Sequence, residues 1–392
     1  MKQISPYNEK TPLRILHLVN DLGYGGAPHV IYNLVKRIDK NRFLPIVGLW
    51  GKIYGSVMIQ DFVGLNIEVV DFQAHSKFDL ESLYSIYKYL STNSIDILHT
   101  HLFLMHIMGR IAGKCARTPW IVSTHHNLKR SNHLVSRVFE KITSPLSNIT
   151  TSVSRAAQET YFTSSEAFSV DALRSGQKHF TIYNSVNAEE IDHIVRNVDV
   201  EQTRRELGLR DEYVFACVGR LHPSKGHIFL IEAVDNLRKT HPSVRLLIVG
   251  DGLLQNELIE KTISMGLREH IHFLGYRDDF YRILAVSNVL VQPSIFEGFG
   301  LASAEAMACG LPVVSTNLPS IAEVVLHKNT GLLVPPGDSQ ALSKAMATIM
   351  DRPELASTYG SNGKQRVEEF FSSKVITRQY EALYKALVDV HP

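Results

Sequence analysis

The sequence predicts an α/β fold with two doubly wound, Rossmann-like domains. Three observations support this prediction: the chain is 392 residues long, short apolar segments alternate with helical ones, and the alternation restarts after a polar passage at residues 187–212. Apolar strands that alternate with helices are typical of parallel sheets covered on both faces. Because ligands bind such sheets beyond the carboxyl ends of the strands, the loops after the strands are the expected positions of a site.

Two series of strands are expected, and each series gives one domain. The strands of the first series are LRILHLV (13–19), FLPIVGLW (43–50), NIEVVDF (66–72), IDILHTH (95–101), PWIVST (119–124) and NITTSVS (148–154). The strands of the second series are YVFACVG (213–219), VRLLIVG (244–250), HIHFLG (270–275), NVLVQPS (288–294), LPVVST (311–316) and TGLLVPP (330–336). The segment at residues 372–390 is expected to form a closing helix.

Composition and charge exclude several classes of protein. Hydrophobic residues make up 44% of the chain and charged residues 20%, which is typical of a globular protein. The net charge of +2 argues against a dedicated nucleic-acid binder. Three cysteines, at positions 115, 217 and 309, cannot all pair and lack metal-ligand spacing. Since no apolar run could span a bilayer and the first ten residues lack a signal-peptide core, we expect a cytoplasmic chain.

A basic, partly apolar segment lies at residues 127–141. Its basic side chains are Lys129, Arg130, Arg137 and Lys141, and its apolar ones are Leu134, Val135, Val138 and Phe139. Residues 1–190 as a whole carry 20 lysines and arginines against 15 acidic residues. Such a segment can rest on anionic lipid headgroups at the inner face of a membrane, or it can be an ordinary surface helix with a solvated basic face. Both interpretations stay open.

Two glutamates stand in apolar, small or glycine surroundings in SIFEGFGLASAEAMACGLP, residues 294–312. The segment should leave a strand, pass through a glycine-framed loop that contains Glu297, and enter a helix near Leu301. Gly310 and Pro312 would end that helix. Glu305 then lies about one turn inside, and no residue at i±3 or i±4 can pair with its carboxylate.

The start of this helix is also an expected anion site. Gly298, Gly300 and Leu301 would present backbone N–H groups there. A nucleotide satisfies both features, with phosphate on these amides and ribose hydroxyls on Glu305. The alternative is that Glu305 pairs with a lysine or arginine across the sheet. We favour the nucleotide because Glu297 adds a second carboxylate at the same rim.

Two basic residues that could bind a phosphate follow an earlier strand. ACVGRLHPSKGH places Arg220 and Lys225 just beyond a strand's carboxyl end. An arginine fork grips phosphate oxygens at two points and a lysine supplies a mobile charge, so the pair could neutralise a diphosphate leaving group. A solvated basic turn is the alternative, and the pair points to function only together with the glutamates of the same domain.

Taken together, these motifs resemble the retaining, nucleotide-sugar-dependent glycosyltransferases of family GT4. The matching positions are Gly219-Arg220-Leu221, Lys225-Gly226, Glu297-Gly298-Phe299-Gly300-Leu301 and Glu305-Ala306-Met307. The resemblance implies the GT-B fold, in which two Rossmann-like domains face an interdomain cleft. It also implies that Arg220 and Lys225 hold the donor diphosphate, that Glu305 binds ribose and that Glu297 lies against the donor sugar.

The resemblance also implies domain limits. The closing helix of this fold returns to the first domain, so residues 1–188 with 373–392 should form the acceptor-side domain. Residues 189–372 should form the donor domain. TIYNSVN (181–187) departs from the family's Asn-Gly-Val-Asp pattern, with Ser185 and Asn187 in place of glycine and aspartate. That departure puts a role for this turn in doubt.

The first half of the chain matches the same family at fewer and less specific positions. Gly25 and Gly26, after the first strand, resemble a glycine pair that lets the backbone approach the donor, although a plain tight turn is the alternative. His125 matches a histidine near the reacting sugar, where it could donate to a hydroxyl or exchange a proton. His99 and His101 are expected to line the cleft. Residues around Gly275-Tyr276 are expected to contact the base.

The resemblance implies transfer of a sugar, from UDP by family frequency, to a hydroxyl of a glycan, glycolipid or small molecule. Retention follows from the resemblance and not from spacing. Because no Asp-x-Asp motif is present and the basic pair can replace a cation, we expect neither a metal nor a cofactor. A nucleotide-sugar epimerase of the same fold and a non-catalytic sugar-binding relative stay open. A dehydrogenase is disfavoured, since NDLGYGGAPH lacks the Gly-x-Gly-x-x-Gly fingerprint.

Overall fold

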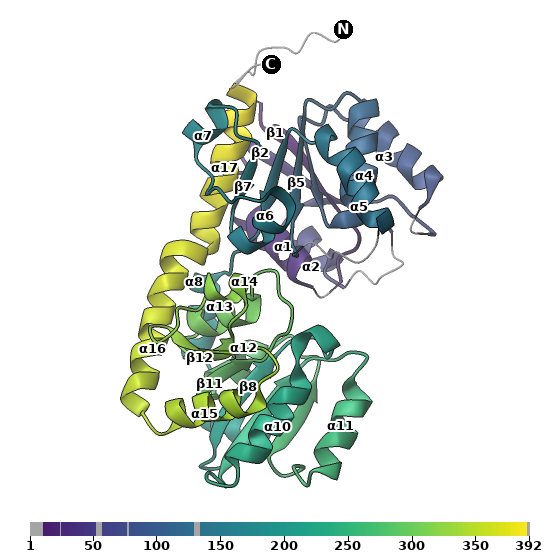
Figure 1. Ribbon diagram of the computed structural model, residues 1–392. Coiled ribbons are helices and arrows are strands. Elements are labelled where there is room, and N and C mark those ends of the chain that lie inside the picture. The colour runs from purple at the N-terminus through teal and green to yellow at the C-terminus, as the bar shows by residue number, and fades with distance from the viewer. Residues whose placement is uncertain (1–10, 24, 52–56, 77, 129–133, 390–392) are drawn as a thin grey trace. The chain divides into compact units, whose positions relative to one another are not determined.

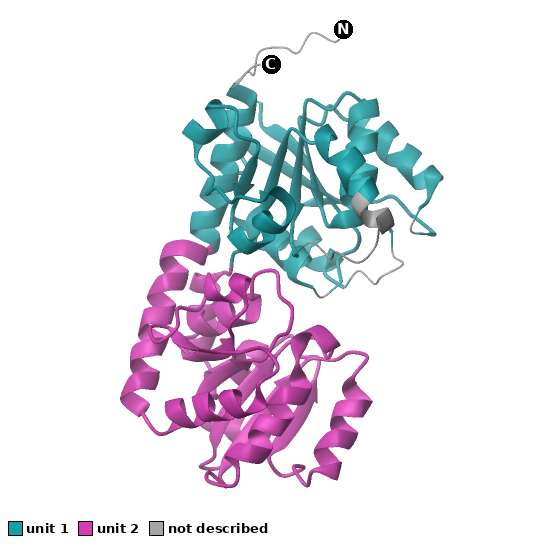
Figure 2. Cartoon of the chain, in the orientation of Figure 1, with its two compact units in different colours: residues 1–185, 373–392 teal, residues 186–372 magenta. Residues whose placement is uncertain are grey.

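The computed structural model describes the chain apart from residues 1–10, 24, 52–56, 77, 129–133 and 390–392 (Figure 1). It divides into two compact units, residues 1–185 with 373–392 and residues 186–372 (Figure 2). The division falls after Ser185, within the polar turn TIYNSVN, where the sequence placed it after residue 188. The second crossing, between Ser372 and Ser373, coincides with the expected return of the closing helix.

Unit 1 is built on a seven-stranded parallel sheet in the order β3-β2-β1-β4-β5-β6-β7. Its strands are β1 Leu13–Val19, β2 Phe43–Leu49, β3 Glu68–Asp71, β4 Ile97–His101, β5 Trp120–His125, β6 Ile149–Ser152 and β7 His179–Thr181. Its helices are α1 Gly26–Arg37, α2 Ile59–Gly64, α3 Leu80–Thr92, α4 Phe103–Cys115, α5 Leu134–Thr143, α6 Arg155–Phe162, α7 Val170–Arg174 and α17 Ser373–Asp389.

Both faces of this sheet are covered by helices, as its nearly continuous apolar strands require. In β1, Ile15 joins a core cluster with α17, whereas Leu16 and Leu18 join a cluster with α3 and α4 on the other face. The C-terminal helix α17 packs on unit 1 through Tyr380 and Tyr384, which are fully buried. Figure 1 shows α17, in yellow, beside the sheet.

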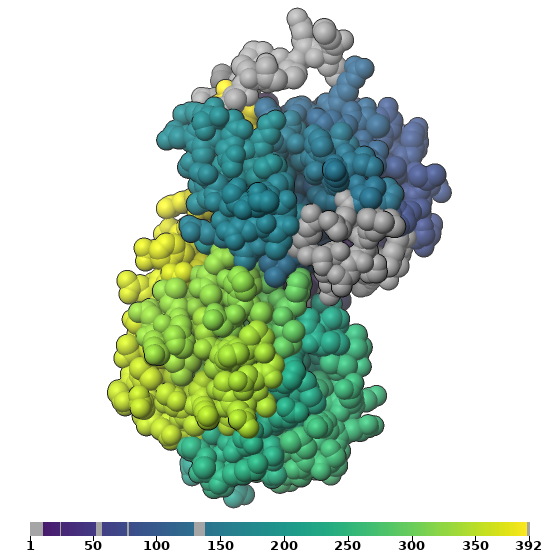
Figure 3. All heavy atoms as spheres, in the orientation of Figure 1, coloured from purple at the N-terminus to yellow at the C-terminus, as the bar shows by residue number. Residues whose placement is uncertain are grey.

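Unit 2 is built on a six-stranded parallel sheet in the order β10-β9-β8-β11-β12-β13. Its strands are β8 Tyr213–Val218, β9 Val244–Val249, β10 Ile271–Gly275, β11 Val289–Gln292, β12 Val313–Thr316 and β13 Gly331–Val334. Its helices are α8 Ala188–Arg196, α9 Val200–Glu206, α10 His227–Leu237, α11 Gln255–Ser264, α12 Phe280–Ala285, α13 Leu301–Ala308, α14 Pro319–Ala322, α15 Ser339–Met350 and α16 Pro353–Arg366. Helices α10 and α15 pack side by side, so the green and lime parts of unit 2 adjoin on its surface (Figure 3).

The predicted fold class is confirmed, since each unit is a parallel sheet between helices. Eleven of the twelve predicted strands contain the observed one, the twelfth (β5) extends one residue further to His125, and most observed strands are shorter than predicted. The short strand β7 was not predicted. Its three residues, His179–Thr181, pair with β6 and lack an apolar run of their own.

Helix α5 begins inside the basic segment, and among its described side chains, from Val138 onward, large apolar residues face outward. Val138, Phe139 and Ile142 are exposed, whereas Glu140 and Thr143 are buried. Lys129 and Arg130 lie outside the described residues, as does the side chain of Arg137. In the part of the chain that the structure describes, no helix is long and apolar enough to cross a membrane.

Candidate functional site

The loops that follow β8 and β11 meet at the carboxyl edge of the unit 2 sheet, where these strands are neighbours. The backbone N–H groups of Ile295 and Phe296 donate to the Ser224 carbonyl at 2.8 and 3.1 Å. Gly226 lies so close to the second loop that a Cβ there would meet the Pro293 carbonyl oxygen at 2.1 Å, and its φ is +66°. The contact therefore depends on glycine at position 226.

This junction brings Lys225 and Glu297 together. The Lys225 Nζ donates to Glu297 Oε2 at 2.5 Å, and both side chains are mostly buried. The same oxygen also accepts from Gln292 Nε2 at 3.1 Å and from Ser294 Oγ at 3.3 Å. Three donors thus fix one carboxylate oxygen. Gln292 and Ser294 were missed from the sequence, although a glutamine in an otherwise apolar, buried strand is a signal of such a role.

Arg220 follows β8 on the first of these loops and is exposed. Among the residues that the structure describes, its guanidinium has no hydrogen bond or ion pair. The guanidinium can therefore bind an anion without first breaking a contact with the protein. Arg220 differs in this respect from Lys225, whose ammonium group is already paired with a carboxylate.

Glu305 lies in α13, as predicted, and its partner is Tyr281 of α12. The Tyr281 hydroxyl donates to Glu305 Oε1 at 3.3 Å. Burial raises the pKa of Glu305 to about 7, and the hydrogen bond from Tyr281 opposes this rise only in part. Among the described residues no lysine or arginine forms an ion pair with Glu305, so the alternative interpretation of the sequence lacks its expected partner. Nothing in the sequence pointed to Tyr281.

The helix start at Gly300 has the geometry of an open amide terminus. Gly300 caps α13 with φ +101°, and as a glycine it offers no capping side chain of its own. A Cβ at Gly300 would meet Ile321 Cδ1 at 2.5 Å, so glycine is required there. Gly298 is buried and Leu301 half-buried in the same turn. The ring of Phe299 is buried in the core, 5.4 Å from that of Phe371, so this side chain supports the loop from behind.

Gly275 and Tyr276 end β10 at the same carboxyl edge, since all strands of this sheet are parallel. The Gly275 carbonyl accepts from the Gly250 N–H at 2.8 Å, which ties the loops after β9 and β10 together. Tyr276 is exposed. Two strands separate β10 from β11 in the sheet order, so these residues lie to one side of the Lys225–Glu297 pair.

In unit 1, Gly25 and Gly26 follow β1 and begin α1, and both are exposed. Gly25 has φ −155°, an extended conformation that any residue adopts, and a Cβ there would meet only Pro28 Cδ at 3.8 Å. The protein's own backbone and packing therefore do not demand glycine at position 25. Such a demand would have to come from a bound molecule.

His125 is the last residue of β5, and its side chain is almost fully buried. Its ring stacks on that of Tyr161 with 3.8 Å between the centroids, and the edge of His106 approaches it at 4.8 Å. Its Nε2 lies 3.7 Å from Glu140 Oε1. Position at a strand end was predicted correctly, but the side chain lies in a packed, charged environment instead of on an open rim.

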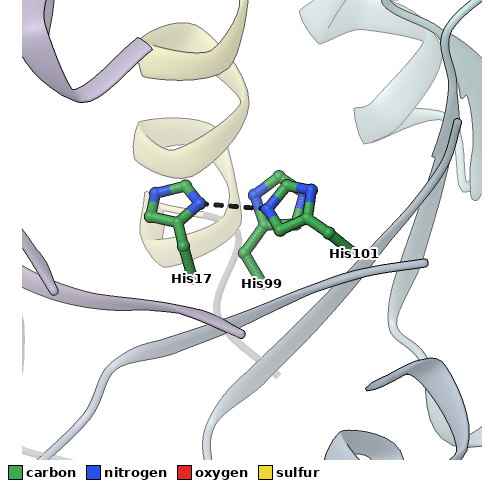
Figure 4. A group of neighbouring side chains, drawn as sticks. All are labelled: His17, His99 and His101. Carbon is green, nitrogen blue, oxygen red and sulfur yellow. Dashed lines mark hydrogen bonds between the residues drawn. The ribbon is translucent and has the colours of Figure 1, made fainter. Parts of the chain in front are cut away.

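His99 and His101, expected to line a cleft, are buried together with His17 (Figure 4). His17 Nδ1 and His101 Nε2 are 3.2 Å apart, and His101 Nδ1 lies 3.0 Å from His126 Nε2. His99 is hydrogen-bonded at both nitrogens, to the hydroxyls of Tyr384 and Thr124 at 2.7 and 2.6 Å.

The same three histidines offer one ligand atom each within 4.8 Å of one another. Two nitrogens that bind one zinc ion at ~2.1 Å lie only about 3.4 Å apart. Both ring nitrogens of His99 and of His101 are already used in hydrogen bonds within the protein. The cluster is therefore a hydrogen-bonded histidine network whose rings would have to rearrange before they could bind a metal.

Solved structures similar to this chain share its two-part fold. Anabaena Alr3699/HepE in complex with UDP-glucose aligns with a TM-score of 0.80 at 23% identity, over 95% of this chain and 100% of the other. Sucrose-phosphate synthase from Thermosynechococcus elongatus aligns with a TM-score of 0.78 at 22% identity, over 97% of this chain and 100% of the other. At these identities the likeness shows the fold, which is the expected GT-B arrangement of two Rossmann-like halves.

Sequence comparisons identify the family. Residues 199–366 match the family described as glycosyl transferases group 1. The chain is 31% identical over 282 residues to the UDP-Gal:alpha-D-GlcNAc-diphosphoundecaprenol alpha-1,3-galactosyltransferase of Escherichia coli, covering 70% of this chain and 71% of that one. It is 25% identical to the N-acetyl-alpha-D-glucosaminyl L-malate synthase of Bacillus anthracis, covering 78% and 79% of the two chains. The loops around Lys225, Glu297 and Glu305 thus lie within a matched segment, and the chain is a glycosyltransferase of the group 1 family.

Proposed function

We propose that this glycosyltransferase moves a sugar from a UDP-sugar to a hydroxyl acceptor, with retention of configuration, in the assembly of a bacterial-type surface polysaccharide or glycolipid. The observation that carries the donor part is the convergence of Lys225, Glu297 and the open start of α13 at one edge of the unit 2 sheet. Ligands of parallel α/β sheets bind at this edge.

The proposed chemistry needs positive charge where the leaving group departs. As the bond from the anomeric carbon to the diphosphate oxygen breaks, negative charge grows on that oxygen. Arg220, the Lys225 ammonium and the amides at Gly300 and Leu301 would stabilise this charge without a metal ion. Glu297 would orient hydroxyls of the donor sugar, since three donors hold one of its oxygens in place. Retention and metal independence are part of the proposal.

The nucleoside is proposed to bind through Glu305, whose carboxylate can accept two ribose hydroxyls. Among the described residues, only the Tyr281 hydroxyl donates to this side chain, at 3.3 Å, so Glu305 retains acceptor capacity. UDP is favoured over other nucleotides because Anabaena Alr3699/HepE was crystallised with UDP and with UDP-glucose, and because the Escherichia coli relative is named for UDP-Gal. Tyr276 is proposed to contact the base.

The acceptor is proposed to be a glycan or glycolipid, and the site cytoplasmic with peripheral contact to the inner face of the membrane. The Escherichia coli relative is named for an acceptor linked to diphosphoundecaprenol, which is a lipid. In this chain Val138, Phe139 and Ile142 of α5 are exposed, as an interfacial helix requires. The roles predicted for Gly25, Gly26 and His125 of unit 1, in approach to the donor and in hydrogen bonding to the sugar, belong to the same proposal.

Two alternatives give different products. A nucleotide-sugar epimerase would change the configuration of the donor's sugar without transferring it to an acceptor and without consuming that acceptor. A non-catalytic relative would leave both the donor and the acceptor unchanged. Chromatography of a UDP-sugar incubated with the protein and a lipid-linked acceptor separates the three cases, because only transfer consumes donor and acceptor together and yields free UDP.

Nucleotide binding measured by calorimetry tests the donor site. We expect UDP to bind without added metal and Glu305→Ala to weaken binding by about tenfold or more, on the order of 1.4 kcal/mol, because the ribose hydroxyls lose their acceptor. Glu260→Ala, an exposed glutamate of α11, is the matched control and should bind as the native protein does. Equal affinities for the native protein and Glu305→Ala, or tighter binding of GDP or ADP than UDP, would contradict the proposed site.

A further inference from the structure

A charged network lies buried beneath His125. Arg110 of α4 is fully buried, and its Nη1 donates to Glu140 Oε1 at 2.9 Å and to Thr143 Oγ1 at 3.3 Å. Its Nε donates to the hydroxyls of Ser123 and Ser147 at 3.1 and 2.8 Å. Four side chains, from β5, from α5 and from the turn before β6, thus hold this guanidinium, so the Glu140 carboxylate beside it has a defined position.

The burial of Glu140 needs an explanation beyond the stability of the fold. A buried ion pair is often no more stabilising than apolar side chains of similar volume. On α5 it occupies the inward face while three large apolar residues of the same helix are exposed. Within the described part of the chain, its second oxygen, Oε2, and the Arg110 Nη2 have no hydrogen-bond partner. Buried polar atoms that the described residues leave without a partner are a cost that a purely structural pair would be expected to avoid.

We propose that Glu140 is a positioning residue for His125, whose imidazole it orients and whose protonated form it stabilises, while Arg110 fixes the carboxylate. The geometry is direct, because the Oε1 atom that accepts from Arg110 also lies 3.7 Å from His125 Nε2. In a buried site a carboxylate at this distance strongly favours the charged imidazole. The stacked ring of Tyr161 confines the imidazole to one plane.

Titratable and charged groups from several elements surround His125. Among the described residues, the side chains close to its ring are Glu140 of α5, His106 of α4, and Tyr161 and Phe162 of α6, and Arg110 lies behind Glu140. Burial lowers the pKa of His106 well below its ordinary range, and the charges of Arg110 and His125 lower it further. Burial raises the pKa of the Tyr161 hydroxyl, and the charge of Glu140 adds to that rise.

The inference deepens the proposed function, because it assigns a partner to the histidine proposed to act on the sugar. It predicts that the ability of His125 to donate a hydrogen bond near neutral pH depends on Glu140. Its test does not need turnover. If the protein transferred no sugar at all, the protonation of His125 would still report whether Glu140 controls it.

The test is an NMR titration of the full-length protein labelled with 13C in its histidine rings, with His125→Gln used to assign the His125 signal. We expect Glu140→Gln, which keeps an oxygen to accept from Arg110, to lower the titration midpoint of His125 by about one to three pH units. Thr143→Ala is the matched control, since it removes a different hydrogen bond to the same guanidinium. Thr143→Ala should move the titration midpoint of His125 by less than about 0.3 pH unit, because it retains the Glu140 carboxylate.

A midpoint in Glu140→Gln within about 0.3 pH unit of the native value, or an equal change in Thr143→Ala, would overturn the proposal. Should Glu140→Gln not fold, Glu140→Asp carries the same test. Glu140→Asp keeps the negative charge but moves it one methylene group further from His125. The titration midpoint of His125 should then fall, but by less than in Glu140→Gln, and an unchanged midpoint rejects the proposal. In a transfer assay Glu140→Gln should lower kcat with a shifted pH profile, which loss of packing alone would not produce.

Discussion

Acidification from about pH 7 to about pH 5 is expected to reduce the free energy of unfolding of unit 1 by several kcal/mol. Burial lowers the pKa of five histidines there, to about 3 for His17 and to about 4 for His126, and well below the ordinary value for His99, His101 and His106. In the unfolded chain each regains its ordinary pKa of about 6.5 and binds a proton that the folded state excludes.

The direction follows from linkage. A histidine whose folded pKa is depressed leaves stability unaffected above about pH 6.5 and reduces it as the pH falls from there toward the folded pKa. Each histidine that stays neutral contributes about 1.4 kcal/mol per pH unit in this window. Because the five lie in one network, some protonate together and the total is smaller than five independent contributions.

Tryptophan fluorescence measures this effect in unit 1, since both tryptophans, Trp50 and Trp120, lie there. Urea unfolding curves at a series of pH values should give a stability that falls steeply below about pH 6.5. His17→Gln should reduce the slope by up to about 1.4 kcal/mol per pH unit, because one proton fewer is taken up on unfolding. His75→Gln, at an exposed position of the same unit, should leave it unchanged. A flat pH dependence, or equal slopes for both variants, would contradict the expectation.

The fold could be predicted from the sequence because strand and helix periods dominate it. Strands such as LRILHLV and VRLLIVG lie in parallel sheets that are covered on both faces. Such strands must be apolar along their whole length, so a segment of seven residues is enough to recognise them. The strand β7 shows the limit of this reasoning. Its three residues form a strand because Thr150, Thr151 and Ser152 of β6 offer a free edge, which is a tertiary fact.

The sequence predicted the backbone features of the candidate site better than the side-chain contacts within it. Glycine spacing indicated the turn into α13, and the structure requires glycine at position 300 for conformation and for space. Tyr281 reaches Glu305 from a different helix, 24 positions away, and no pattern links the two. From the sequence, Glu140 is one more charge of an amphipathic helix, and only the structure shows that it is buried while Val138, Phe139 and Ile142 of the same helix are exposed.

Glu305→Gln is expected to stabilise unit 2 by about 3 kcal/mol at about pH 8 and by much less at about pH 5. Burial raises the pKa of Glu305 in the folded protein to about 7, above its ordinary value. A carboxyl group with a raised pKa gives its full stability below the unfolded pKa of about 4.5, and that stability is lost as the pH rises through 7. The neutral amide keeps an oxygen for the Tyr281 hydroxyl and carries no charge that burial could penalise.

Labelling of the Cys217 thiol in urea, followed by mass spectrometry, measures unfolding of unit 2, because Cys217 is buried in its sheet. Glu260→Gln is the control and should show no pH-dependent gain. Equal stabilisation by Glu305→Gln at both pH values would show that the carboxylate is not the cause. Saturating UDP should reduce the loss of stability that the native protein shows between about pH 5 and about pH 8. UDP binds only the folded state, and ribose hydroxyls that donate to the Glu305 carboxylate favour its charged form. Such a side chain lowers the free energy of unfolding of its own domain near neutral pH, while a ligand restores that free energy. The presence of such a side chain is better explained by a role in binding than by a role in folding.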